Sequence, residues 1–213
     1  IYGDAGRDEI HAFSTGNEVW GGGGNDDINV TAGHNDVWGG DGNDVITASG
    51  QNNNLRGSEG DDHITAFGAN NIVHGWQDND TIEAYAKNNE LYGDDGHDVI
   101  TAYADKNDIW GGNGNDQISA MAGGNEIWGG AGKDTFYVNG LDNTVYGGAD
   151  ADQFHLGLDV SGVPVGGFNN VHGGAADDTI IAYGLKNDIS ADAGDDTIEA
   201  RGGINDVRGN TGN

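Results

Sequence analysis

The stretch Trp110-Gly111-Gly112-Asn113-Gly114-Asn115-Asp116-Gln117-Ile118 returns with small changes along the whole chain, and successive copies begin 18 residues apart. We number each copy from its first glycine, so that Gly111 is position 1, Asp116 is position 6 and Ile118 is position 8. A fixed period of this kind is typical of proteins built from stacked units, in which each unit contacts its neighbours along one axis.

Apolar residues recur at three positions of the repeat. Position 8 is Ile or Phe and position 17 is Val, Leu or Ile in every full copy, while position 10 is mostly Ala. Because alternate residues of a strand point to the same face, positions 8 and 10 would line one strand and position 17 would face them from a second. One copy cannot bury these side chains, whereas stacked copies bury them in a continuous core. The pattern predicts an all-β fold, a parallel β-solenoid of about 12 coils of 18 residues.

We interpret residues 1–213 as one such solenoid domain. One copy is longer than the others, and its extra residues, which include the only proline, predict a surface loop inserted at about 156–168. Both ends of the chain cut across the repeat, which indicates a segment of a longer chain.

The composition excludes several partners. The formal net charge is −28 with only 8 Lys and Arg residues, so the chain lacks the basic clusters that bind nucleic acid. No apolar run approaches the ~18 residues of a membrane span, so membrane insertion is not expected. The absence of cysteine excludes disulfides and thiolate metal sites. A compact state with this charge requires counter-cations.

An aspartate occupies position 6 of every full copy, directly after the glycine-rich turn. Stacked coils would place these carboxylates in a line, where they repel one another unless cations lie between them. Oxygen ligands of this kind suit Ca²⁺ better than Mg²⁺ or Zn²⁺, and one ion between adjacent coils gives about ten Ca²⁺. Ten such ions would change the net charge from −28 to about −8, an ordinary value for a soluble domain. The predicted metal ligands are Asp8, Asp26, Asp44, Asp62, Asp80, Asp98, Asp116, Asp134, Asp152, Asp178 and Asp196.

Backbone carbonyls of the same turns would complete the coordination, because glycine permits turns whose carbonyls converge. Examples are the carbonyls of Gly21, Gly23, Asn25, Gly39, Asp41, Asn43, Gly111, Asn113 and Asn115. Some turns lose their glycines, as where Trp76-Gln77-Asp78 replaces Gly-x-Gly. We expect weaker or altered sites near Asp80, Asp152, Asp178 and Asp196.

The segment Gly21-Gly22-Gly23-Gly24-Asn25-Asp26-Asp27-Ile28-Asn29 and the segment 111–119 resemble the RTX, or haemolysin-type, calcium-binding nonapeptide, G-G-x-G-x-D-x-U-x. The resemblance recurs over the whole chain. It implies a right-handed parallel β-roll, export by type I secretion to the extracellular space or cell surface, and folding only when Ca²⁺ is met outside the cell.

The chain differs from ordinary RTX rolls, which carry the nonapeptide on both edges. Its alternate nine residues read Ala-Tyr-Ala-Asp-Lys-Asn-Asp-Ile-Trp at 102–110, with Asn107 in place of the metal-binding Asp. We predict Ca²⁺ along one edge and an asparagine ladder along the other, with a second metal row as the alternative; the one-sided design resembles the ice-binding region of a bacterial RTX adhesin. The ladder comprises Asn17, Asn35, Asn53, Asn71, Asn89, Asn107, Asn125, Asn143, Asn169, Asn187 and Asn205.

Position 18 is often aromatic and should face outward, because it follows the inward-facing position 17. Stacking of these rings along the solenoid is one interpretation. A surface for sugar stacking or subunit packing is the other, since exposed rows of aromatic residues are unusual on a monomer. This candidate binding face comprises Trp20, Trp38, Tyr92, Trp110, Trp128 and Tyr146.

The sequence thus predicts an extracellular, calcium-binding structural or adhesive β-solenoid whose folding is driven by Ca²⁺. The alternatives are a surface-layer or filament subunit that stacks end to end, and a carbohydrate-binding module, so the partner would be a second copy or a cell-surface glycan. Ice binding is disfavoured because Glu83 and Tyr137 break the threonine column at position 9. No enzymatic activity is predicted, since the aspartates are accounted for as ligands and the scattered histidines form no triad.

Overall fold

The computed structural model describes residues 1–157, 168–184 and 186–212, and within them every regular element is a β-strand. One sheet contains the twelve odd-numbered strands, β1 (Tyr2–Ala5), β3 (Glu18–Gly23), β5 (Asp36–Asp41), β7 (Asn54–Glu59), β9 (Ile72–Gln77), β11 (Glu90–Asp95), β13 (Asp108–Asn113), β15 (Glu126–Ala131), β17 (Asn143–Ala149), β19 (Phe168–Ala175), β21 (Lys186–Ala193) and β23 (Asp206–Arg208). The other contains the eleven even-numbered strands, β2 (Glu9–Ala12), β4 (Asp27–Val30), β6 (Val45–Ala48), β8 (His63–Ala66), β10 (Thr81–Ala84), β12 (Val99–Ala102), β14 (Gln117–Ala120), β16 (Thr135–Val138), β18 (Gln153–Leu156), β20 (Thr179–Gly184) and β22 (Thr197–Gly202).

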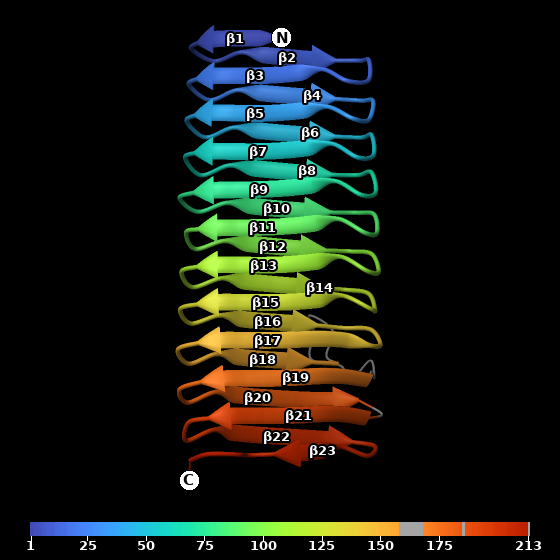
Figure 1. Ribbon diagram of the computed structural model, residues 1–213, viewed down its shortest axis with the longest axis vertical. Coiled ribbons are helices and arrows are strands. Elements are labelled where there is room, and N and C mark those ends of the chain that lie inside the picture. Colours follow the sequence, from blue (N-terminus) through green and yellow to red (C-terminus); the bar gives the residue numbers. More distant parts are fainter. Residues whose placement is uncertain (158–167, 185, 213) are drawn as a thin grey trace.

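These strands form a parallel β-solenoid, as the repeat predicted. The chain alternates between the two sheets, so that each coil adds one strand to each of them (Figure 1). Neighbouring strands are parallel and in register with the repeat, so Ile100 lies opposite Ile118 and Trp110 lies opposite Trp128. The described residues make eleven complete turns plus β23, one turn fewer than the estimate of about twelve.

The longer copy does not interrupt either sheet. β18 ends at Leu156 and β19 begins at Phe168, and Asn143 lies opposite Asn169 although the two are 26 residues apart. Most of the loop predicted at about 156–168 falls on residues 158–167, which lie outside the described residues.

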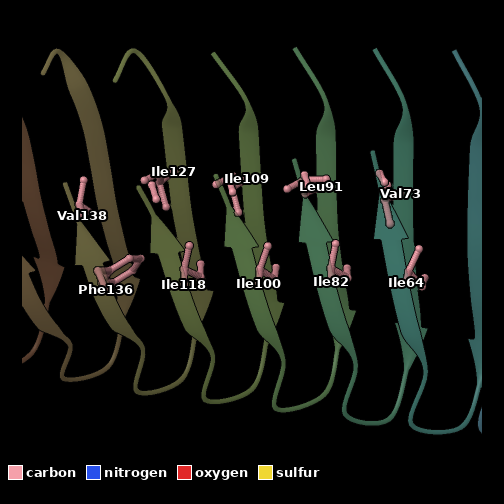
Figure 2. Packing of buried hydrophobic residues seen from close by; sticks show 14 of the residues in the cluster. Ile64, Val73, Ile82, Leu91, Ile100, Ile109, Ile118, Ile127, Phe136 and Val138 are labelled. Carbon is pink, nitrogen blue, oxygen red and sulfur yellow. The ribbon is translucent and has the colours of Figure 1, made fainter. Parts of the chain in front are cut away.

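The core is a narrow double row of apolar side chains between the sheets. Ile118 and Ala120 point inward from β14 and meet Ile127 from β15, and all three are completely buried. Figure 2 shows the same arrangement repeating from coil to coil, with Ile100 and Ile109 in the preceding turn. Each coil therefore buries its few apolar groups only because a neighbour covers them on either side.

One edge of the solenoid is closed by asparagine side chains at position 15. The backbone N–H of Asn107 donates to Oδ1 of Asn125 at 2.9 Å, and Nδ2 of Asn107 donates to the carbonyl of Ala104 at 2.8 Å. The preceding residue has a left-handed backbone, with φ of 58° at Lys106 and 59° at Asn88. The side-chain amide of Asn107 thus stabilises its own turn through Nδ2, and its Oδ1 accepts a hydrogen bond from the N–H of Asn89 in the preceding coil.

Replacing Asn107 with alanine should destabilise the protein strongly. The change would remove the acceptor of the Asn89 N–H and the donor to the Ala104 carbonyl. Nδ2 of Asn89 would lose one of its two acceptors and keep the Ala86 carbonyl. We expect a loss of roughly 2–4 kcal/mol of unfolding free energy, measured by urea denaturation in Ca²⁺. The control is Asp105→Ala, a change at an exposed residue of the same turn, and equal losses in the two variants would contradict the proposed role of the amide.

Candidate metal centre

The opposite edge carries the aspartates of position 6. Each lies at the end of the glycine-rich turn that leads from an odd strand into the next even strand; Asp116, for example, directly precedes β14. The side chains turn into the solenoid, and nine of them are buried, from Asp26 to Asp178. Asp8 and Asp196, in the outermost full coils, are half-buried.

In the ten carboxylates from Asp26 to Asp196, only one oxygen accepts a hydrogen bond. Oδ1 of Asp116 accepts a hydrogen bond from the N–H of Asp98 at 2.9 Å, and the N–H of Asp116 donates to Oδ1 of Asp134 at 2.8 Å. The second oxygen is buried and has no hydrogen-bond partner. This holds for Oδ2 of Asp8, Asp26, Asp44, Asp62, Asp80, Asp98, Asp116, Asp134, Asp152, Asp178 and Asp196.

These unpartnered oxygens lie against the glycines of position 1. A Cβ atom added to Gly111 would come within 2.4 Å of Asp116 Oδ2 and within 2.6 Å of the Gly129 carbonyl oxygen. Gly21 is placed in the same way, against Asp26 Oδ2 and the carbonyl oxygen of Gly39. The position 1 carbonyl of one coil and the free carboxylate oxygen of the preceding coil therefore face the same small volume.

The other predicted carbonyl ligands are less free. The carbonyl of Asp41 accepts a hydrogen bond from the N–H of Gly24 at 2.7 Å, and Asn113 accepts one from Gly96 at 2.9 Å. Gly23 is bonded to Gly6 in the same way. At position 5, the side-chain Oδ1 atoms of Asn25 and Asn115 accept hydrogen bonds from the N–H groups of Asn43 and Lys133, and these bonds do not involve the backbone carbonyls predicted as ligands. The position 3 carbonyls retain one lone pair for a metal, so the structure favours the position 1 carbonyls as nearest partners of the carboxylates.

The donor set fits a hard divalent cation. Carboxylate and carbonyl oxygens are the ligands of Ca²⁺, which takes six to eight of them in flexible geometry. The described residues contain no cluster of three or more His, Cys, Asp or Glu side chains that could hold a metal. A calcium ion here would thus draw on the Asp side chains of one or two coils and on backbone carbonyls for the rest.

The electrostatics of the row also favour a cation. Burial, reinforced by the neighbouring aspartates, raises the pKa of Asp62 and Asp80 to about 8, although a backbone hydrogen bond to each carboxylate opposes the shift. The same causes raise the pKa of Asp98 and of Asp134 to about 7. A cation beside Oδ2 would stabilise the ionised carboxylates and reverse these shifts.

The turns without glycine keep the backbone of the others. Gly112 at position 2 has φ of 117°, and the non-glycine residues at that position remain left-handed, with 75° at Asp94 and 88° at Trp76. At position 4, φ is 71° at Asp78. The N–H of Asp80, in the turn that contains Trp76, still donates to Oδ1 of Asp98 at 2.8 Å. In these coils a non-glycine residue keeps the left-handed backbone despite its strain. This indicates that packing against the neighbouring coils fixes the conformation of the turn.

The aromatic residues of position 18 form a stack along the outer face of the odd-numbered sheet. Trp110 and Trp128 have ring centroids 4.8 Å apart at an interplanar angle of 3°, and Trp20 and Trp38 are 4.0 Å apart at 7°. Arg56 and His74 also occupy position 18 and join the stack, since the guanidinium of Arg56 lies 4.6 Å over the Trp38 ring and His74 stacks on Tyr92. The rings thus present their edges to solvent and their faces to one another.

The chain belongs to the RTX repeat family. The family model described as RTX calcium-binding nonapeptide repeat (4 copies) matches residues 1–27, 20–55, 47–82, 83–118, 110–145, 128–160 and 165–198. No curated protein and no solved structure gave a significant match. In the described part of the chain, no helix has the length and apolar character needed to cross a membrane.

Replacing Asp116 with asparagine should stabilise the calcium-free protein and reduce the additional stability that Ca²⁺ provides. Asparagine keeps the Oδ1 acceptor, removes a buried charge and places an N–H donor beside the Gly129 carbonyl. In chelator at about pH 6, where the calcium-free fold is expected to persist, we expect the unfolding temperature to rise by roughly 2–6 °C, and the further increase on adding Ca²⁺ to shrink. Asp105→Asn makes the same charge change on the other edge and should affect neither; a loss of stability in chelator for Asp116→Asn would refute this account.

The calcium-free protein should be more stable in acid than in base. Between the unfolded pKa of 3.8 and the folded pKa of about 8 for Asp62, the folded state holds more protons than the unfolded state. The free energy of unfolding therefore falls as pH rises through this range. In chelator we expect circular dichroism to show strand structure at about pH 5 and its loss at about pH 8.5, where Ca²⁺ restores it. The opposite pH trend would contradict the assignment of the aspartate row.

Proposed function

We propose that the chain is an extracellular, calcium-binding structural module with an adhesive role, whose folding is driven by Ca²⁺. The observation that carries the proposal is the row of eleven carboxylate oxygens that lack hydrogen-bond partners along one edge. Burying so many unpartnered acceptors is unfavourable unless they are protonated or bind a cation. Near neutral pH, Ca²⁺ meets this need with the oxygen ligands that the turns provide.

Ca²⁺ binding would supply much of the folding free energy. The core consists of small contributions from each coil, and the net charge of −28 opposes compaction. The two oxygens of the candidate site come from different coils, so the site is absent from the unfolded chain and its binding energy becomes folding energy. About ten ions per chain, one between adjacent aspartates, would leave a net charge of about −8.

The extracellular location and adhesive role rest on family membership and on shape. RTX repeats are typically found in secreted proteins, and export would place the chain where Ca²⁺ is abundant. The solenoid is long and presents two extended sheet faces, a form suited to spacing or displaying other parts of a surface protein (Figure 1). We assign no catalytic role to the aspartate row, because its side chains are directed into the solenoid.

Removal of Ca²⁺ tests this proposal directly. At about pH 8 we expect chelator to abolish the strand signal in circular dichroism and Ca²⁺ to restore it cooperatively. Mg²⁺ at the same concentration should be much less effective. Metal analysis of the refolded, desalted protein should find about ten Ca²⁺ per chain. A strand spectrum that is unchanged in chelator, or refolding without bound Ca²⁺, would exclude calcium as the folding switch.

A further inference from the structure

Trp76 is an exception on the outer face of the odd-numbered sheet. It occupies position 2, where Gly40, Gly112 and Gly130 lie in other coils, and its own backbone is left-handed with φ of 88°. Its side chain is 48% exposed, more than any other tryptophan in the described residues. A bulky residue in this conformation is strained, as are Ser58 and Asp94 in the adjoining coils, so the size and exposure of the indole are what set Trp76 apart.

The indole of Trp76 is not part of the aromatic stack. Its nearest aromatic neighbour is His74, at a centroid distance of 6.2 Å and an angle of 52°, so the two rings are tilted rather than stacked. The rings of position 18 instead lie face to face, as Tyr92 and Trp110 do at 4.4 Å and 4°. Trp76 therefore offers solvent a ring surface that the stacked residues use on one another.

Two open hollows meet at Trp76. The larger, about 750 Å³, extends over β11, β13 and β15, where Gly112 and Gly130 lack side chains at position 2. The smaller, about 530 Å³, extends over β5 and β7 past Gly40 and Ser58. Trp76 and Gln77 line both hollows. The two hollows therefore form one shallow trough along the solenoid, and Trp76 lies between them.

The polar groups of the trough include both charges and neutral amides. In the larger hollow, His74 pairs with Asp94 at 2.8 Å and Asn113 donates to Asp95 at 2.7 Å. In the smaller hollow, Asp41 and Glu59 supply acceptors. Arg56 also lines it, and its Nη1 atom is buried without a hydrogen-bond partner. This mixture suits a ligand rich in groups that both donate and accept hydrogen bonds.

From these features we infer that the trough binds an uncharged oligosaccharide, with one sugar ring packed on the indole of Trp76. An exposed aromatic ring offers an apolar platform, and surrounding carboxylates, amides and a guanidinium match sugar hydroxyls. An anionic polymer would be repelled by the carboxylates of Asp41, Glu59, Asp94 and Asp95, and a purely cationic ligand would offer the Arg56 guanidinium no acceptor, whereas sugar hydroxyls can pair with both. The inference goes beyond the proposed function, because calcium-driven folding does not require it.

The experiment is isothermal titration calorimetry of the calcium-loaded protein with neutral hexasaccharides of glucose, mannose, galactose and N-acetylglucosamine. At least one should bind saturably near one site per chain, with Kd of about 1 mM or tighter. Trp76→Gly should weaken that binding by roughly tenfold or more. This variant introduces the residue found in other coils, so its unfolding temperature should be unchanged or higher.

Phe13→Ala is the matched control, because it removes another exposed aromatic ring far from the trough, next to β2, and should leave sugar binding unchanged. The inference is overturned if none of the hexasaccharides binds, if Trp76→Gly binds as well as the unmodified chain, or if the chain binds only a cationic probe such as polylysine. Each of these results would leave the calcium titration by circular dichroism unaffected, so a failure here is distinguishable from a failure of the proposed function.

Discussion

Each residue of this solenoid lies beside its counterpart from the neighbouring coil, because both sheets are parallel and share one register. For most side chains this identity is favourable. Isoleucine packs on isoleucine, and planar rings stack on rings, as Trp110 does on Trp128. For aspartate it is unfavourable, since the register lines up buried like charges. The need of this edge for a proton or a cation follows from that conflict.

The two edges show how one atom changes the chemistry of a turn. The backbone N–H groups of Asn107 and Asp116 each donate a hydrogen bond to the Oδ1 atom of the next residue in the row, at 2.9 and 2.8 Å respectively. The second side-chain atom differs. Nδ2 of Asn107 donates to the Ala104 carbonyl, whereas Oδ2 of ionised Asp116 can only accept and faces the same space beside Gly111 as another acceptor, the Gly129 carbonyl. From Asn35 to Asn143 the asparagine edge is therefore satisfied by the protein alone, although Asn169 Nδ2 and Asn187 Oδ1 further along are buried without partners. The aspartate edge instead needs a proton or a cation.

The outer face of the odd-numbered sheet follows the same rule of identical neighbours, with one informative exception. Along position 18, Arg56 and His74 take places in the aromatic stack because a flat guanidinium or imidazole packs on a ring much as indole does. Trp76 lies in a run of three coils without glycine at position 2, and it is the only aromatic residue at that position in the run, since the coils on either side carry Ser58 and Asp94. A repeat protein gains a local site most readily by such a departure, since the remaining coils hold its backbone in place.

The sequence by itself determined the period, the all-β parallel solenoid, the inward positions 8, 10 and 17, and the RTX family. A strict repeat makes these features local, because each coil touches only its neighbours. Tertiary structure alone decided three further points. From Asp26 to Asp196, Oδ1 of each position 6 aspartate is already bonded while Oδ2 is not; the faces of the position 18 rings are turned toward one another; and Trp76 projects over a trough. Each depends on how side chains are oriented across the gap between coils. Residue type and spacing do not specify that orientation, and the packing of three or more adjacent coils does.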